Sequence, residues 1–415
     1  MNGIHPLSGS HANLRFLFFT NECVGLGHLR RTLALAQAVG EHSPAASSLI
    51  VTGSTEASSY ALPQRVDTVK LPVLSKDSNG SYRSRQLAIE AEELHSLRSR
   101  LALTAADSFG PAVAIVDKTP LGVGQELLPT LEALRASGRT RLVLGLRDVE
   151  DDPSVVRRHW RQAGMVDAIR RLYDAVLVYG PSSAPDALDC LGSPDLGMPV
   201  YHTGYVGRAL PAQGPEDLPA DYVLVTVGGG VDGFGLLDAA IAAIRERPIP
   251  YPLVVVTGPL MPTADVDRLL AHSAGLDVTI LTFRPDMEAV IAGARAVIAM
   301  AGYNTVSELV RAGKPSLLVP RVHPSEEQLV RASALARAGS VTMLHPSELT
   351  PARLRSMLDP LLDERPHPHD AADHDGARNA AEILVDLASQ SAPAAAHART
   401  RSVPALNYVR PLSIA

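Results

Sequence analysis

The sequence has few cysteines, few aromatic residues and no excess of basic charge. It contains 2 cysteines in 415 residues, Cys23 and Cys190, whose spacing fits neither a disulfide framework nor a zinc site. Because this usage is typical of a reducing compartment, we expect the protein to be cytoplasmic. The formal net charge is −6, so a nucleic-acid backbone, which binds basic proteins through counterion release, is not an expected partner.

Long apolar runs are also missing. No apolar stretch reaches the roughly 18 residues that a membrane-spanning helix requires. Residues 1–13 are polar and contain Gly, Ser and His, which is unlike a secretory signal peptide. We therefore expect no transmembrane segment, and any membrane contact would be peripheral.

Short apolar runs alternate with longer amphipathic stretches. The runs are bounded by Gly, Pro, Asn or Asp, which is typical of buried strands, and the stretches between them have helical periodicity. The alternation predicts an α/β fold with parallel sheets and crossover helices. Strands are expected at 14–19, 48–52, 113–117, 141–146, 175–179, 222–227, 253–257, 278–281, 296–299 and 316–319, and helices at 29–39, 83–106, 125–137, 236–245, 287–292, 306–312 and 328–338.

The alternation pauses near Gly207. Residues 208–220 contain three prolines and no clear periodicity, which indicates a linker. We therefore predict two Rossmann-like domains, an N-terminal one over 1–208 and a C-terminal one over 209–388, with a mostly irregular tail over 389–415. Two such units in series would face each other across a cleft lined by the carboxyl ends of their strands.

The first expected strand leads into a glycine loop, TNECVGLGHLR at 20–30. Gly25 and Gly27 precede a helix that should start near His28. The free N–H groups of a helix N-terminus, together with glycines that allow close approach, suit an anion. A tight turn without a ligand is the alternative, because Arg30 stands where the dinucleotide fingerprint has its third glycine.

A histidine, two arginines and a cysteine lie in or beside this loop. His28 has an imidazole that titrates near neutrality and can take a proton from a hydroxyl, although a structural or capping role is the alternative. Arg30 could attract an anionic substrate, and Arg31 either shares that role or is a solvated helix residue. Cys23 has no identifiable base beside it, and we assign it no role.

A second glycine loop follows the strand expected at 222–227. Glycines occupy five of the eight positions from 228 to 235, which suggests a backbone that must approach a ligand such as a diphosphate. A flexible hinge is the alternative. No lysine follows at the position that a P-loop requires, so a P-loop NTPase is disfavoured.

The segment AMAGYNTVSELVRAGKPSLLVP at 299–320 combines a strand end, a turn and a helix start. We expect Asn304 or Thr305 to cap a helix that carries Glu308 in its first turn. The Glu308 carboxylate could hold two ribose hydroxyls, or it could belong to a capping box. Farther along, Glu327 and Gln328 suit hydrogen bonds to sugar hydroxyls, or they begin a solvated helix.

Polar residues also end two strands of the first half. Asp117 and Lys118 follow one strand, and Arg147 and Asp148 follow another. Strand ends line the cleft of α/β proteins, so these residues could contact an acceptor, or they could form ion pairs within the loops.

Two acidic or histidine-rich segments have the composition of a metal site without its spacing. We read the acidic cluster at 150–152 as a solvated helix start. We read the histidines at 367, 369 and 374 as part of a surface loop. No metal site is predicted.

Several segments resemble a known family. Residues 301–320, 326–328 and 334–339 are similar to the C-terminal donor domain of the GT-B glycosyltransferases that add N-acetylglucosamine to the lipid-linked peptidoglycan precursor. TVSE at 305–308, AGKPSLLVP at 312–320 and Gln328 carry the resemblance. The first half, with GLGHLRR at 25–31, resembles a group of predicted glycosyltransferases with that start. The resemblance covers about residues 14–385.

The resemblance implies a GT-B fold and transfer of a sugar from a nucleoside diphosphate sugar, with UDP expected, to a hydroxyl or amine. The acceptor would be a small molecule or lipid-linked. The nucleotide sugar is a co-substrate, no other cofactor or metal is expected, and inversion is the expected outcome. Glu308 would hold the ribose, Phe283 and Arg284 would flank the base, and Gln328 with Glu327 would hold the sugar. The expected catalytic residues are His28 and Asp117. The residues expected in the acceptor or phosphate loop are Gly25, Gly27, Arg30 and Arg147. The expected donor-binding residues are Gly228, Gly229, Gly230, Phe283, Arg284, Gly302, Asn304, Thr305, Glu308, Glu327 and Gln328.

Three positions depart from the peptidoglycan enzymes. Gly230 stands in place of a serine, Arg284 in place of an apolar residue and Glu327 in place of a glutamine. The departures leave the base and the sugar of the donor open. A UDP-sugar 2-epimerase of the same architecture and a non-catalytic nucleotide-sugar-binding protein are the alternative functions.

Overall fold

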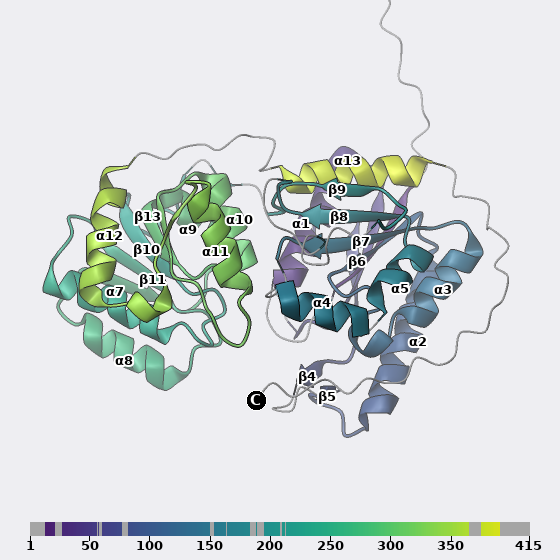
Figure 1. Cartoon of the computed structure of the whole chain (residues 1–415), viewed down its shortest axis with the longest axis horizontal. Coiled ribbons are helices and arrows are strands. Elements are labelled where there is room, and N and C mark those ends of the chain that lie inside the picture. Colours follow the sequence, from purple (N-terminus) through teal and green to yellow (C-terminus); the bar gives the residue numbers. More distant parts are fainter. Residues whose placement is uncertain are drawn as a thin grey trace, which may run out of the picture.

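The computed structural model describes residues 13–20, 27–55, 57, 60–76, 82–149, 153–162, 164–182, 188, 195–207, 210–211, 213–364 and 375–390. Two α/β units follow one another along the chain, each with helices on both faces of a parallel sheet (Figure 1).

The first unit is built on a seven-stranded sheet in the order β3-β2-β1-β6-β7-β8-β9. Every neighbouring pair is parallel. The chain runs outward from β1 to one edge and then returns to the other side of β1 through β6. The strands are β1 (Arg15–Phe19), β2 (Ser47–Thr52), β3 (Val66–Lys70), β6 (Val113–Asp117), β7 (Arg141–Arg147), β8 (Ala175–Tyr179) and β9 (Val200–His202).

Helices cover both faces of this sheet. One face packs on α2, α3, α4 and α5, and the other packs on α1 and α13. A separate hairpin of β4 (Leu74–Lys76) and β5 (Tyr82–Ser84) extends from the unit. The helices are α1 (Gly27–His42), α2 (Ala91–Phe109), η2 (Val123–Gln125), α3 (Leu128–Ser137), α4 (Pro153–Gln162) and α5 (Met165–Leu172).

The second unit repeats this winding in six parallel strands, ordered β12-β11-β10-β13-β14-β15. The strands are β10 (Tyr222–Thr226), β11 (Leu253–Val256), β12 (Val278–Leu281), β13 (Ala294–Ala299), β14 (Ser316–Leu318) and β15 (Thr342–Met343). The helices are α7 (Phe234–Glu246), α8 (Thr263–Ser273), α9 (Met287–Gly293), α10 (Tyr303–Ala312), α11 (Glu327–Arg337), η3 (Pro346–Glu348) and α12 (Pro351–Asp363).

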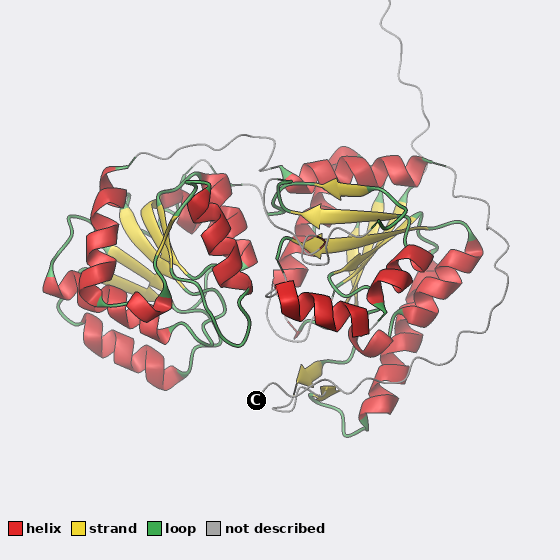
Figure 2. Cartoon of the chain, viewed as in Figure 1, coloured by secondary structure: helices red, strands yellow, loops and turns green. Residues whose placement is uncertain are grey.

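The last described helix, α13 (Gly376–Ser389), follows the second sheet in sequence but packs on α1 of the first unit (Figure 2). Asn379 Nδ2 donates to the carbonyl oxygen of Thr203 at 2.9 Å, and Gly376 lies so close to the backbone of Gly204 that a Cβ atom would overlap with it. The chain therefore crosses between the two units a second time.

The predicted α/β class with two Rossmann-like units is confirmed. All ten predicted strands are present within two residues of the expected ends, because their apolar runs are buried on both faces, as in β6 and β8. The helix predicted at 83–106 is wrong at its start: residues 82–84 form β5, bends follow, and the helix begins at Ala91. The pairing of β5 with β4 outweighs the helical pattern there.

In both units the strand order reverses beside the first strand, between β1 and β6 and between β10 and β13. Crossover helices leave these adjacent strands in opposite directions, so the loops at their carboxyl ends diverge and leave room for a ligand. The two switch points are therefore the places to look for a site. The first glycine loop follows β1, the second follows β10, and the Gly302 turn follows β13.

Candidate functional site

A histidine and an aspartate meet at the first switch point. His28 is the second residue of α1, directly beyond β1, and Asp117 is the last residue of β6. His28 Nδ1 lies 2.5 Å from Asp117 Oδ2, and the exposed fractions of the two side chains are 16% and 5%. The two residues predicted to be catalytic are thus in direct contact, although 89 positions separate them in sequence.

Arg31 completes this cluster. Its Nε donates to Asp117 Oδ1 at 3.1 Å and its Nη2 to Asp117 Oδ2 at 2.7 Å. The Nη2 atom also lies 2.9 Å from His28 Nδ1. Only 2% of the Arg31 side chain is exposed, so the alternative of a solvated helix residue is wrong. One helical turn beyond His28, its side chain points back at β6 rather than outward.

The charges of this cluster fix its protonation. Burial lowers the pKa of His28 to about 4, the Asp117 carboxylate opposes this, and the charges of Arg31 and Arg147 add to the lowering. Burial alone would raise the pKa of Asp117, but Arg31 and His28 hold it well below its usual range. At neutral pH the cluster therefore contains a neutral imidazole and an ionised carboxylate. An Nδ1–H that donates to Asp117 leaves the Nε2 lone pair available to accept a proton.

The donor helix candidate, α10, follows the second switch point. Gly302 is its N-cap, in an extended conformation with no side-chain hydrogen bond to the cap. The prediction that Asn304 or Thr305 caps the helix is wrong, because Val306 N already donates to the Gly302 carbonyl at 2.9 Å. Glu308 accordingly lies beyond the first turn. The uncapped N–H groups of the first turn make this end suited to an anion.

Glu308 is buried, and a residue of the first unit reaches it. Arg30 Nη2 donates to Glu308 Oε1 at 2.6 Å and to Glu288 Oε1 at 2.9 Å. Arg30, predicted to attract an anion, thus pairs with two carboxylates of the second unit. Glu288, in the first turn of α9, was not expected from the sequence, since an acidic residue at a helix start is commonplace.

The N-terminus of α10 adjoins the first glycine loop. A Cβ atom at Gly27 would lie 3.1 Å from Asn304 Nδ2, so glycine allows the first turn of α1 to approach the first turn of α10. Thr305, like Asn304, is partly buried. Gly27 precedes His28, so the histidine and the α10 N-terminus are neighbours. Gly25 lies outside the described residues.

The second glycine loop is held by backbone packing. Gly230 has φ +93°, and a Cβ there would overlap with the carbonyl oxygen of Thr257. Gly258 in turn packs on the backbone of Gly228 and Gly229. A Cβ at Gly228 would meet nothing within 4 Å, and one at Gly229 would meet only Leu260 Cδ1 at 3.8 Å. Two of the three predicted glycines thus leave open space above the backbone, whereas Gly230 serves the fold.

A third group of charges joins the units. Arg147 Nη2 donates to Glu327 Oε2 at 2.9 Å, and Arg321 Nη2 approaches Glu327 Oε1 at 3.4 Å. Gln328 Oε1 accepts from the Arg321 backbone N–H at 3.1 Å and is buried. The charge of Arg147 holds the pKa of Glu327 below its usual range, although burial alone would raise it. Glu327 and Gln328 therefore begin α11 at the interface rather than in solvent.

The residues predicted to flank the base lie at the end of β12. Phe283 is 47% exposed. Arg284 donates to Asp286 Oδ1 at 2.8 Å and to Asp217 Oδ2 at 2.6 Å, so its guanidinium is held in place by two carboxylates.

The sequence did not single out one further pair, Asp148 with Arg331. Arg331 Nε donates to Asp148 Oδ2 at 2.7 Å and Nη2 donates to Asp148 Oδ1 at 2.8 Å, with both side chains at most 2% exposed. Arg331 sits on α11 between apolar positions, which was the available signal. An arginine on the buried face of a helix needs a partner.

The acidic cluster at 150–152, Cys23, Cys190 and the histidines at 367, 369 and 374 lie outside the described residues. Among the residues that the structure does describe, no group of three or more histidine, cysteine, aspartate or glutamate side chains is arranged to hold a metal ion. Within the same residues, no helix is both long enough and apolar enough to cross a membrane.

Two Rossmann-like units, with polar clusters at both switch points and a returning C-terminal helix, define the GT-B fold. Solved structures share it across nearly their whole length. MurG of Acinetobacter baumannii has a TM-score of 0.57 at 16% identity, covering 90% of this chain and 99% of that one. The calicheamicin glycosyltransferase CalG4 has 0.55 at 17% identity, over 91% and 96%. The glycosyltransferase VinC, solved in complex with dTDP, has 0.55 at 17%, over 90% and 99%.

Residues 223–387, which span most of the second unit and α13, match the glycosyltransferase family 28 C-terminal domain. A similar protein is the UDP-N-acetylglucosamine–N-acetylmuramyl-(pentapeptide) pyrophosphoryl-undecaprenol N-acetylglucosamine transferase of Agrobacterium fabrum, 33% identical over 182 residues, 42% of this chain and 47% of the relative. The enzyme of that name from Brucella abortus is 37% identical over 199 residues, 46% and 52%. The chain spans about half the length of these curated relatives.

Proposed function

We propose that the protein is a glycosyltransferase that moves a sugar from a nucleoside diphosphate sugar to a hydroxyl or amine. One observation carries the proposal. A neutral histidine bonded to a buried aspartate stands beside the uncapped N-terminus of a helix that belongs to a family 28 donor domain. The Gly27–Asn304 approach joins the two halves. A base and an anion site side by side suit a reaction in which an oxygen loses a proton while a diphosphate leaves.

In the proposed mechanism, each proton and each charge that forms has a group that accepts or stabilises it. His28 Nε2 takes the proton of the acceptor hydroxyl as its oxygen attacks the anomeric carbon. The bond from that carbon to the diphosphate oxygen breaks, and its electron pair leaves with the nucleoside diphosphate. The first-turn N–H groups of α10 and the open backbone at Gly228 and Gly229 stabilise the leaving charge. Asp117 holds the tautomer and stabilises the imidazolium that forms. Attack opposite the leaving group inverts the anomeric configuration.

The remaining roles concern donor recognition. Glu308 would exchange its bond to Arg30 for the ribose hydroxyls. Phe283 and Arg284 would flank the base, and Glu327 with Gln328 would hold the sugar. UDP-N-acetylglucosamine is the first donor to test, because the names of the curated relatives contain it.

The acceptor can be one of two kinds of molecule. A lipid-linked acceptor, as in the names of those relatives, would require peripheral membrane contact, whereas a small-molecule acceptor would not. The cytoplasmic location expected from the cysteine usage stays a prediction.

The proposal is tested by following the fate of UDP-N-acetylglucosamine. With a panel of hydroxyl, amine and lipid-linked acceptors, a glycosyltransferase forms a glycoside and releases UDP in equal amounts. A sugar epimerised at C2 without an acceptor would instead establish the UDP-sugar 2-epimerase alternative. Binding of UDP without any turnover across the panel would favour a nucleotide-sugar-binding protein. Repeating the assay with TDP-sugars distinguishes a donor with a different nucleotide base from a different type of reaction.

Metal independence is a separate part of the proposal. EDTA should leave the rate of UDP release unchanged, since helix N–H groups supply the charge stabilisation that a divalent ion would otherwise give. Loss of activity in EDTA that magnesium or manganese restores would contradict this mechanism.

A further inference from the structure

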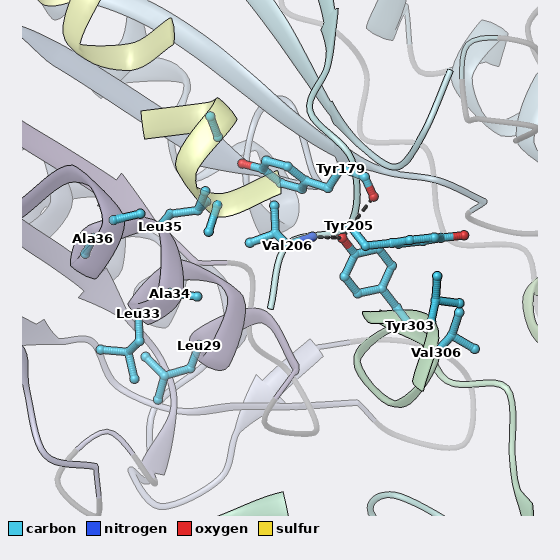
Figure 3. Packing of buried hydrophobic residues seen from close by; sticks show 14 of the residues in the cluster. Leu29, Leu33, Ala34, Leu35, Ala36, Tyr179, Tyr205, Val206, Tyr303 and Val306 are labelled. Carbon is cyan, nitrogen blue, oxygen red and sulfur yellow. Dashed lines mark hydrogen bonds between the residues drawn. The ribbon is translucent and has the colours of Figure 1, made fainter. Parts of the chain in front are cut away.

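A tyrosine of the second unit lies beside the histidine cluster of the first. Tyr303 is the first residue of α10 and is 4% exposed. Its hydroxyl donates to the carbonyl oxygen of Tyr179 at 2.9 Å and accepts from the backbone N–H of Val206 at 3.1 Å. Figure 3 shows both bonds, with the ring of Tyr205 beside Tyr303. These bonds fix the ring in one position between the units.

The Tyr303 ring faces two buried guanidinium groups. The Cζ atom of Arg31 lies 5.0 Å from the ring centroid, and that of Arg331 lies 5.8 Å from it. The first guanidinium holds Asp117 and the second holds Asp148, at the ends of the neighbouring strands β6 and β7. One aromatic ring therefore contacts both arginine–aspartate pairs.

Arg31 has an aromatic ring of each unit close to it. Besides Tyr303, the ring of Tyr179 at the end of β8 lies 5.3 Å from its Cζ atom. A guanidinium that interacts with aromatic rings gains cation–π attraction and loses few orientations, since its planar group is already rigid. The orientation of Arg31 matters because its Nη2 donates to Asp117 Oδ2, the same oxygen that accepts from His28 Nδ1.

We infer that Tyr303 is a positioning residue that holds Arg31, and through it Asp117 and His28, in the geometry needed for proton transfer. This inference rests on the proposed function for its meaning in catalysis. Because Tyr303 is also the first residue of α10, it ties that geometry to the helix N-terminus proposed to receive the diphosphate. The donor helix and the base are thereby aligned by one side chain rather than by the charged pairs alone.

The direct test is the state of His28, which can be measured without any substrate. Nitrogen NMR of the full chain labelled with ¹⁵N-histidine gives the tautomer and the titration of each ring, and His28→Asn identifies the His28 signals among the 14 histidines. The groups that face His28 are Asp117 on β6, Arg31 on α1 and Arg147 at the end of β7. In the wild type we expect the Nδ1–H tautomer and a titration well below neutral pH.

Replacement of the ring should change that state. In Tyr303→Met, Arg31 keeps the ring of Tyr179 but loses that of Tyr303, and water gains access, so the titration of His28 should move toward its usual value by about one pH unit or more. Tyr303→Phe keeps the ring and should leave the titration in place. Tyr222→Met is the matched control, because Tyr222 is also buried and donates to the carbonyl of Val290 at 2.6 Å, whereas the charged groups near it are Arg284, Asp286 and Asp217 rather than Arg31.

A second readout separates positioning from simple loss of stability. With UDP and UDP-N-acetylglucosamine as probes, Tyr303→Met should keep UDP affinity within about threefold while turnover falls by about tenfold or more. Tyr303→Phe should retain most of the turnover.

Three results would overturn the inference: a folded Tyr303→Met with an unchanged His28 tautomer and titration, an equal His28 shift in Tyr222→Met, or a Tyr303→Phe variant that shifts His28. If Tyr303→Met does not fold, Tyr303→Leu, which also removes the ring, takes its place. Failure of the wild type to bind UDP would refute the proposed function, and the NMR experiment would still decide whether Tyr303 positions His28.

Discussion

The two halves of the candidate site are built from different parts of the chain. In the first unit, the chemistry lies in side chains: His28, Asp117 and Arg31 form a buried charged cluster at the switch point. In the second unit it lies in the backbone, in the uncapped start of α10 and the open face at Gly228 and Gly229. A base needs a tuned side chain, whereas a diphosphate needs N–H groups and room, so each half suits one partner of a transfer reaction.

The contacts that join the halves differ in the same way. Arg30 with Glu308 and Arg147 with Glu327 are ion pairs whose second-unit partners are predicted to bind the donor. Asp148 with Arg331 is more deeply buried, and neither residue is predicted to bind the donor. The first two pairs can therefore open for a ligand, while the third holds the units together.

The largest effect expected from breaking one half is the loss of the base. His28→Asn keeps polarity and size but cannot accept a proton at neutral pH, so turnover should fall by about 10²–10⁴-fold. UDP binding should stay close to wild type, since His28 belongs to the half that does not hold the donor. The rate of UDP release with an acceptor from the panel measures this. Near-normal turnover in the Asn variant would remove His28 as the base.

Breaking the Asp148–Arg331 contact between the two units should lower the free energy of unfolding more than the other substitutions. Arg331→Met leaves Asp148 buried without its partner, and the free energy of unfolding should fall by about 3–5 kcal/mol. Urea unfolding measures the change. Arg321→Met is the control: its ion pairs are longer and its side chain is 29% exposed, so a loss within about 1 kcal/mol is expected. Equal losses in the two variants would mean that burial of the Asp148 pair is not what joins the units.

Within the second half, two adjacent glycines should respond differently. Gly230→Ala places a Cβ against the Thr257 carbonyl in a left-handed conformation and should destabilise the protein by about 3 kcal/mol. Gly229→Ala has space for its Cβ and should change stability by less than about 0.5 kcal/mol. Its effect should instead be weaker UDP binding. An alanine at 229 that leaves UDP affinity unchanged would show that the diphosphate does not approach this backbone.

The smallest effect concerns pH. Burial lowers the pKa of His28 from about 6.5 in the unfolded chain to about 4 in the folded protein, so below about pH 6.5 the unfolded chain binds the proton first. Stability therefore falls as pH decreases from 6.5 toward 4, by about 2 kcal/mol at pH 5 for this group. Asp117, whose pKa is also lowered, contributes in the same sense, but only as pH falls below its usual range, outside this window. Urea unfolding at pH 7 and pH 5 should show a smaller loss in His28→Asn than in wild type. Equal losses would mean that His28 titrates normally.

The sequence predicted the backbone half of the site better than the side-chain half. A strand, a glycine turn and a helix start are local features, so the loop at 228–230 and the start of α10 were found. Only the cap of α10 was wrong, because it was predicted at Asn304 or Thr305 and lies at Gly302. Glu288, Tyr303 and Arg331 were not found, because each acts through a partner far along the chain. His28 and Asp117 were both named, but no sequence pattern indicates that they touch.

Calorimetric titration of UDP into wild type, Glu308→Ala and His28→Asn distinguishes the donor site from the base, and it needs no acceptor. Glu308→Ala should weaken UDP binding by about 1–3 kcal/mol, through lost hydrogen bonds to a charged group, while His28→Asn should bind UDP within about twofold of wild type. Unchanged UDP affinity in a folded Glu308→Ala, or a loss in His28→Asn as large as in Glu308→Ala, would contradict a donor site held by the second unit and a base supplied by the first.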